Sequence, residues 1–124
     1  MTMHITLNPD NQVIKVPAGN VTLEFIDQSG CHIDVVLAIQ GIKGATFHFE
    51  DEGNSSVNKT YTLDAGRSYT CSVSLYGYSY KTLNRNYKIF MKINNKIVLT
   101  AEGVLPDNPG FDNCGVLFYL ETPV

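Results

Sequence analysis

Apolar and polar residues alternate with a period of two along most of the chain. The stretches 21–25, 45–50 and 69–75 show this alternation most clearly. Because successive side chains of a β-strand point to opposite faces of a sheet, the pattern predicts strands with one buried and one solvated face. No window of about a dozen residues carries a sustained apolar repeat of helical period, so we expect little or no helix.

Turn-forming residues separate these stretches. Gly, Pro, Asn, Asp and Ser cluster at 8–11, 17–20, 29–30, 51–56, 64–67 and 105–110. This spacing predicts roughly eight to ten short strands, which is typical of an antiparallel β-sandwich of the Ig-like or jelly-roll kind. With 124 residues and no linker or low-complexity segment, the chain is expected to form a single all-β domain over 1–124.

One hairpin can be predicted in detail, at residues 86–103. A two-residue turn at Asn94 and Asn95 would mix apolar and polar residues on both faces of the hairpin. A three-residue loop over 94–96, or a β-bulge, instead aligns the apolar residues and sets Lys88 opposite Glu102. We therefore expect such a loop or bulge, with Val98 on the outer face and a buried face made of Ile89, Met91, Ile93, Ile97, Leu99 and Ala101.

Tyrosines and basic residues concentrate at 74–96, which holds four of the seven tyrosines and five of the nine basic residues. If the alternation continues past Gly77 without a bulge, Tyr76, Tyr78 and Tyr80 lie together on the outer face. Aromatic rings with polar tips, and arginine, are enriched at protein interfaces. The stretch therefore predicts a binding surface composed of Tyr76, Tyr78, Tyr80, Arg85, Tyr87 and Lys88.

The charges are unevenly distributed. Six basic and no acidic residues lie between Asp64 and Glu102, while the rest of the chain carries three basic and twelve acidic residues. The formal net charge is nevertheless −3 and the isoelectric point is near 5.5. Because non-specific nucleic-acid binding depends on the summed neutralisation of phosphates, this balance argues against a dedicated nucleic-acid binder.

Two functions fit these features. The first is a non-catalytic interaction protein, such as an inhibitor, accessory factor or assembly subunit, whose tyrosine-rich, locally basic β-face binds a protein partner or a second copy in an oligomer. The alternative is a lectin-like module, with the tyrosines stacked on sugar rings. An ordinary solvated strand also explains the tyrosines, because tyrosine is a good strand residue.

A loop at 105–115 is the candidate metal site. Asp107, Asn108, Asp112 and Asn113 supply side-chain oxygens there, and Ca²⁺ prefers oxygen ligands. The order of residues is not that of an EF-hand. Calcium bound at this loop would serve the glycan-binding alternative, whereas a turn that uses Asp, Asn, Pro and Gly for their backbone preferences needs no ion.

Candidate catalytic groups are sparse. Cys31 and His32 are neighbours in sequence and should point to opposite faces of a strand, so they cannot form a nucleophile–base couple. The three histidines are scattered, which makes a weak case for zinc, and no phosphate-binding loop, HExxH or nucleophile elbow is present. We therefore expect a protein that is not an enzyme.

The cysteines and the apolar runs bear on the compartment. Three cysteines without a CxxC pair favour reduced thiols. The longest apolar run, 35–39, is far too short to span a bilayer, and the first residues do not resemble a signal peptide. These features predict a soluble protein that is cytoplasmic or released without a conventional signal peptide.

Overall fold

The computed structural model contains ten β-strands and no helix among the residues it describes, which are 3–7, 12–50, 53–79, 84–107 and 110–124. The all-β prediction is therefore confirmed. The strands are β1 (Thr6–Leu7), β2 (Val13–Lys15), β3 (Gly19–Asp27), β4 (His32–Ile39), β5 (Ile42–Phe49), β6 (Ser55–Leu63), β7 (Ser68–Tyr78), β8 (Asn86–Ile93), β9 (Lys96–Val104) and β10 (Phe111–Glu121).

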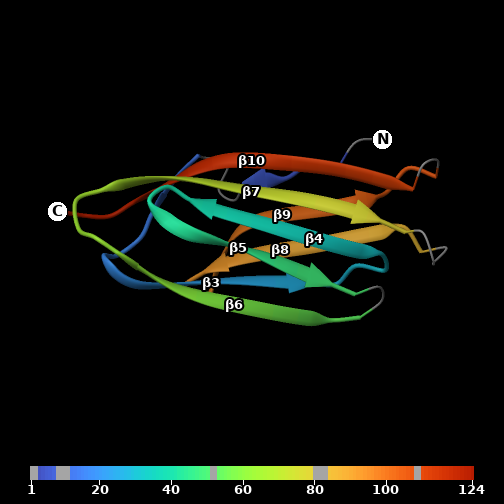
Figure 1. Ribbon diagram of the computed structural model, residues 1–124, viewed down its shortest axis with the longest axis horizontal. Coiled ribbons are helices and arrows are strands. Elements are labelled where there is room, and N and C mark those ends of the chain that lie inside the picture. Colours follow the sequence, from blue (N-terminus) through green and yellow to red (C-terminus); the bar gives the residue numbers. More distant parts are fainter. Residues whose placement is uncertain (1–2, 8–11, 51–52, 80–83, 108–109) are drawn as a thin grey trace.

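The strands form two sheets of five that pack face to face. Sheet A has the order β1-β9-β8-β3-β6, and sheet B has the order β2-β10-β7-β4-β5. In Figure 1, β10, β7, β4 and β5 cross in front of sheet A. Consecutive strands change sheet except at the hairpins β4–β5 and β8–β9. Because β9 and β8 lie between β1 and β3, the strand order differs from that of an immunoglobulin domain. The sequence alone could not decide between the Ig-like and jelly-roll orders.

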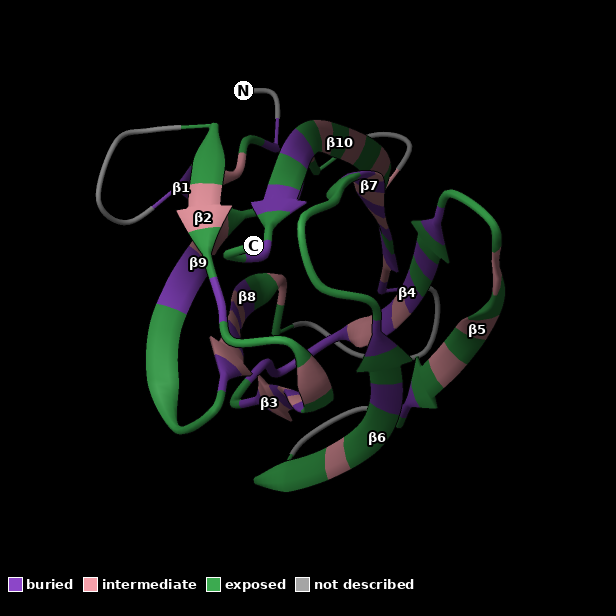
Figure 2. Cartoon of the chain, turned by 90° about the vertical axis from the view of Figure 1, so that its left-hand side faces the viewer, coloured by how far each residue is buried: buried purple, intermediate pink, exposed green. Residues whose placement is uncertain are grey.

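The core lies between the two inner faces. In β7 the buried residues Tyr69, Cys71, Val73 and Leu75 alternate with more exposed ones, as the period-two pattern predicted. Buried and exposed bands likewise alternate along the strands in Figure 2. The largest fully buried side chains come from both sheets and include Phe25, Phe49 and Phe118.

The hairpin of β8 and β9 confirms the predicted bulge and corrects the predicted loop. The turn has two residues, Asn94 and Asn95, both with positive φ (48° and 68°), as in a type I′ turn. The irregularity lies one residue further into the strands, where Lys92 pairs with Ile97 but Met91 pairs with Leu99.

The bulge changes which residues of β9 are buried. Val98 is the additional residue and is 3% exposed, whereas Ile97 is 37% exposed. The prediction had these two residues the other way round. The type I′ turn matches the twist of the strands, and the bulge then restores the apolar alignment of Ile89 with Ala101 and the predicted pairing of Lys88 with Glu102.

The described residues contain no helix long and apolar enough to cross a membrane.

Candidate functional site

The outer face of sheet B carries most of the exposed large hydrophobic residues. Nine large hydrophobic residues are exposed in the described part of the chain, and six of them lie on this face: Val13, Val36, Tyr76, Phe111, Leu117 and Tyr119. Leu117, at 53%, is the most exposed of the six. They are held outward by the regular register of β10, β7 and β4, in which Asn113, Tyr76 and Asp34 are neighbours across the sheet.

Small side chains lie beside a hollow on this face, near the end of β4 and the beginning of β7. Ser74 is the neighbour of both Val36 and Gly115, and Ser72 is the neighbour of both Ala38 and Leu117. The hollow, of about 310 Å³, is lined by Ala38, Gln40, Thr70, Ser72 and Leu117, together with Ile39 and Cys71. The face therefore combines exposed rings and aliphatic groups with a shallow socket.

The outer face of sheet A has a different chemistry. Glu24 is the register neighbour of Lys92, and Lys88 is the neighbour of Glu102. Thr22 and Thr60 bring their hydroxyl oxygens within 3.1 Å of each other across β3 and β6. Paired opposite charges and hydroxyl groups are typical of a solvated sheet surface.

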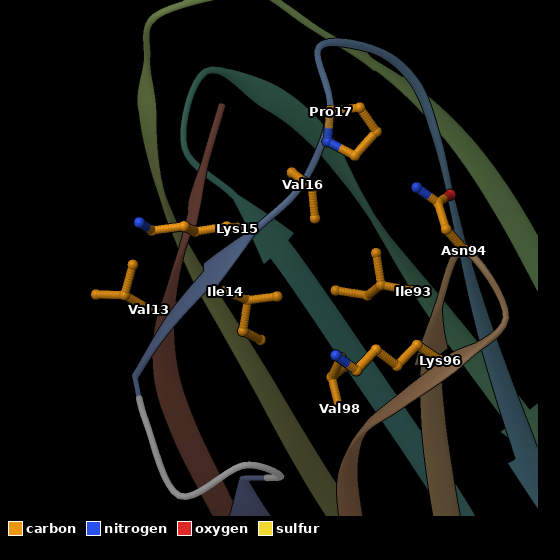
Figure 3. A pocket seen from close by; sticks show the side chains of 9 residues that line it. All are labelled: Val13, Ile14, Lys15, Val16, Pro17, Ile93, Asn94, Lys96 and Val98. Atoms are coloured by element: carbon orange, nitrogen blue, oxygen red, sulfur yellow. The ribbon is translucent and has the colours of Figure 1, made fainter. Parts of the chain in front are cut away.

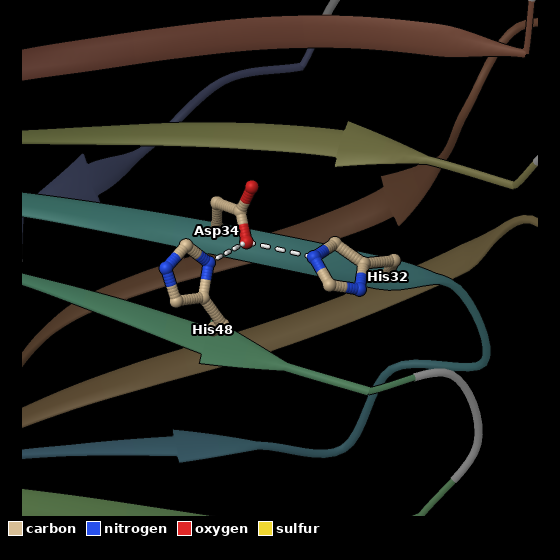
Figure 4. A group of neighbouring side chains, drawn as sticks. All are labelled: His32, Asp34 and His48. Carbon is tan, nitrogen blue, oxygen red and sulfur yellow. Dashed lines mark hydrogen bonds and ion pairs between the residues drawn. The ribbon is translucent and has the colours of Figure 1, made fainter.

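A histidine–aspartate–histidine cluster lies at one side of the sheet B outer face (Figure 4). His32 and Asp34 are two residues apart on β4 and so share a face, and His48 is the register neighbour of Asp34 on β5. His32 Nε2 and His48 Nδ1 both lie 2.7 Å from Asp34 Oδ1. The candidate ligand atoms of the three residues lie within 4.8 Å of one another.

Tyr78 supports this cluster from β7. Its hydroxyl donates a hydrogen bond to Asp34 Oδ2 at 3.0 Å, and its ring stacks on His32 with centroids 4.5 Å apart and an interplanar angle of 19°. Partial burial of Asp34 disfavours its charge, but the hydrogen bonds from His48, His32 and Tyr78 outweigh this and lower the pKa of the carboxyl group. Asp34 is therefore an ionised acceptor held by three donors.

The predicted tyrosine and basic surface is divided between the two sides of the sandwich. The alternation of β7 runs through Gly77 without a bulge, so Tyr76 and Tyr78 lie on the outer face of sheet B, as expected. Lys88 lies on the outer face of sheet A. The expectation of one continuous face was wrong, because β7 and β8 belong to different sheets.

Two further residues of that predicted surface, Tyr87 and Arg85, lie away from the outer face of sheet B. Tyr87 is 3% exposed and points into the core, so its placement on a binding surface was also wrong. Arg85 precedes β8 and donates from Nη1 to the carbonyl oxygen of Leu105 at 2.9 Å. Tyr80 lies outside the described residues.

The expected loop at 105–115 ends where β10 begins, at Phe111, so the placement of Asp112 and Asn113 in a loop was wrong. These two residues are successive on a strand, and their side chains point to opposite faces. Asp112 Oδ2 accepts a hydrogen bond from the backbone N–H of Met3 at 2.7 Å, and Oδ1 accepts one from that of Asn113 at 2.8 Å, so this carboxylate ties β10 to the N-terminal segment. Asp107 is exposed, and Asn108 lies outside the described residues.

The thiols of Cys71 and Cys114 are poorly nucleophilic. Burial raises the pKa of Cys71 to about 12 and, with Asp112 nearby, that of Cys114 to about 11. None of the three cysteines forms a disulfide. Cys31 is buried while His32 lies on the outer face, which confirms that these neighbours point apart.

A cavity of about 310 Å³ lies where β2 approaches the β8–β9 hairpin (Figure 3). The side chains of Ile14, Val16, Ile93 and Val98 point toward one another there, and Lys15 points away. The cavity is an aliphatic gap at the edge of the two sheets, and it brings no cluster of chemically reactive groups together.

The histidine cluster corrects the expectation that the histidines are scattered. The spacing of His32 and Asp34 already places both on one face of a strand. Adding His48 required the register of the β4–β5 hairpin, which contains an irregularity between Leu37 and Ile39. Comparison of the chain with protein-family models, curated proteins and solved structures found no match.

Proposed function

We propose that this chain is a non-catalytic binding protein that docks a protein partner on the outer face of sheet B. The observation that carries the proposal is the concentration of six of the nine exposed large hydrophobic residues, among those described, on that face. Large apolar side chains left exposed cost solvation free energy in the isolated protein, so their concentration on one face favours an interaction site.

The chemistry of the face supports a protein partner. Tyr76 and Tyr119 offer large rings with hydroxyl tips, a combination enriched at protein interfaces. The hollow beside Leu117 suits a partner side chain, because the strongest contacts of an interface are usually side chains seated in pockets. The outer face of sheet A presents no tyrosine among the described residues, and its hollow is lined by polar side chains: Thr22, Glu24, Asn58, Asn94 and Asn95.

A glycan is the second candidate ligand. Tyr76 and Phe111 present exposed rings on adjacent strands, and Ser74 and Asn113 place hydrogen-bonding groups beside Tyr76. Calcium is not required for this mode of binding. Binding to a glycan panel that is lost in Tyr76→Ser but kept in Leu117→Ser would favour this candidate over a protein partner.

The test of docking uses a photo-cross-linking amino acid at one of two positions. Position 117 carries Leu117, 53% exposed on the proposed face, and position 97 carries Ile97, 37% exposed on sheet A. In the cells that make this chain, we expect a discrete protein adduct from position 117 and none from position 97. Substitution of Tyr76 by Ser should weaken the position 117 adduct.

The molar mass in solution identifies self-association. Light scattering over a concentration series should show whether the adduct contains a second copy, and Leu117→Lys should then return the chain to a monomer. Equal cross-linking from positions 117 and 97, or none from either, would contradict docking on this face.

A further inference from the structure

The cluster of His32, Asp34 and His48 has the composition of a transition-metal site. Two imidazole nitrogens and one carboxylate oxygen are the ligands that Zn²⁺ takes in many proteins, with water completing a tetrahedral shell. Ca²⁺ and Mg²⁺ prefer shells made of oxygen alone. The cluster is the one group of at least three His, Cys, Asp or Glu residues among those described whose ligand atoms converge in this way.

The side chains of the cluster must adjust to hold an ion. At the bond lengths and tetrahedral angles of protein zinc sites, two ligand atoms of one ion lie about 3.3 Å apart. Each imidazole nitrogen now lies 2.7 Å from Asp34 Oδ1 and must withdraw by about 0.6 Å to reach that spacing, while ligand atoms that now lie up to 4.8 Å apart must come closer. The His48 side chain is 66% exposed and can rotate at little cost.

The surroundings fix the other two ligands. Stacking on Tyr78 orients the ring of His32, and the hydroxyl of Tyr78 binds the second oxygen of Asp34. The side chains of His32 and Asp34 are 16% and 20% exposed. A hydrogen bond to the second oxygen of a ligating carboxylate is the usual means by which a protein orients such a ligand. Two ligands are thus preorganised, and the third closes from the solvent side.

We propose that His32, Asp34 and His48 bind a divalent transition-metal ion, with Zn²⁺ as the expected ion, on the outer face of sheet B. The side chain of Tyr78 acts as a positioning residue for Asp34. The solvent side of the site, next to His48, leaves room for water or for a ligand atom of another molecule. This proposal does not depend on docking, because it concerns the isolated chain.

The test is a titration of the purified chain, free of any histidine tag, with Zn²⁺ in competition with a chromophoric chelator. The wild type should bind one ion per chain. His48→Ala should weaken binding by more than about 100-fold, because removal of a ligand costs more than removal of a group that orients one. His48 is exposed, so this variant should fold, which circular dichroism verifies.

Two further variants separate the cluster from adventitious binding. His4→Ala removes an exposed histidine outside the cluster and should bind zinc like the wild type. Tyr78→Phe keeps all three ligands, removes the hydrogen bond to Asp34, and should weaken binding by about tenfold. Binding by His48→Ala that equals the wild type, or a wild type that binds no stoichiometric ion, would overturn the proposal.

Discussion

At the scale of single residues, Asp27 is a buried carboxyl group with only one of its two oxygens hydrogen-bonded. It is 1% exposed, and its Oδ1 accepts a hydrogen bond from the backbone N–H of Ser29 at 3.1 Å. Its Oδ2 is buried without a hydrogen-bond partner. Burial therefore raises the pKa of Asp27 to about 6.

This raised pKa predicts that Asp27 destabilises the fold as the pH rises. The native state holds the proton of Asp27 more tightly than the unfolded state, so its contribution is most favourable below the ordinary pKa of 3.8 and is lost as the pH passes 6. Between pH 4 and pH 7 the free energy of unfolding of the wild type should fall by about 2 kcal/mol relative to that of Asp27→Asn. Urea denaturation of both proteins measures the difference.

The comparison with Asp27→Asn isolates this carboxyl group. The pKa of Asp34 is lowered, so Asp34 contributes stability that is lost on acidification, which is the opposite dependence on pH. Asp34 is present in both proteins, so its contribution cancels in the comparison. Parallel stability curves for the two proteins between pH 4 and pH 7 would contradict the assignment.

The ring of Tyr87 leaves no room for a side chain at position 103, so this position needs glycine. A Cβ atom at this position would lie 2.5 Å from the hydroxyl oxygen of Tyr87 and 2.8 Å from the ring carbon that bears it. Tyr87 is 3% exposed and cannot move aside freely. Gly103→Ala should therefore lower the free energy of unfolding by about 1–3 kcal/mol in urea denaturation.

Gly115 provides the matched control. A Cβ atom there would meet Ser74 Oγ at 3.3 Å, a contact that a small rotation of the half-buried serine side chain relieves. Gly115→Ala should change stability by less than about 0.5 kcal/mol, as surface substitutions usually do. Equal losses in the two variants would show that the ring of Tyr87 is not the cause.

At the scale of elements, the turn of Asn94 and Asn95 sets the register of the β8–β9 hairpin. Both residues have positive φ, and Asn94 also binds β3, because its N–H donates to the carbonyl oxygen of Thr22 at 3.0 Å and its Oδ1 accepts from Thr22 N–H at 3.1 Å. The turn thus joins three strands of sheet A.

Substitution of Asn95 tests the turn. Asn95→Ala should lower the free energy of unfolding by about 1 kcal/mol, because alanine pays the full steric cost of left-handed backbone. Asn95→Gly removes that cost and should be at least as stable as the wild type. Thermal denaturation distinguishes the two variants, and a stable Asn95→Ala would contradict the assigned turn.

The same hairpin shows what periodicity can and cannot predict. The apolar alternation required an extra residue between the strands, and this prediction was confirmed. It could not decide between the turn and the strand as the place of that residue, because Ile97 and Val98 are both β-branched and each fits a buried position. The twist of the strands favours the two-residue turn. The extra residue therefore lies within β9 as a bulge, and Val98 is buried.

At the scale of the whole molecule, the sequence predicted the sandwich but not the partition of its surfaces. Each strand's own alternation fixes which side chains point inward, so Tyr76 and Tyr78 were placed correctly. Which strands share a sheet depends on pairings between residues far apart in sequence. The sequence therefore joined Tyr76 and Lys88 on one face, whereas they lie on opposite sides of the sandwich.

The candidate metal cluster was missed for the same physical reason. His32 and Asp34 could be placed on one face from their spacing alone. His48 and Tyr78 come from strands on either side of β4, so their approach to Asp34 depends on two strand registers at once. Local patterns carry no such information.

The position of β10 has a consequence for the way the chain is made. This strand pairs with β7 on one side and, in parallel, with β2 on the other. β2 is the first strand of sheet B in the sequence, and it is joined to the rest of the sheet through β10, the last of the ten strands. A chain whose β10 has not yet left the ribosome cannot close this sheet, and one edge of β7 stays unpaired until then. Nascent chains that stop short of residue 111 should therefore require chaperone protection, and folding should complete only after translation of β10.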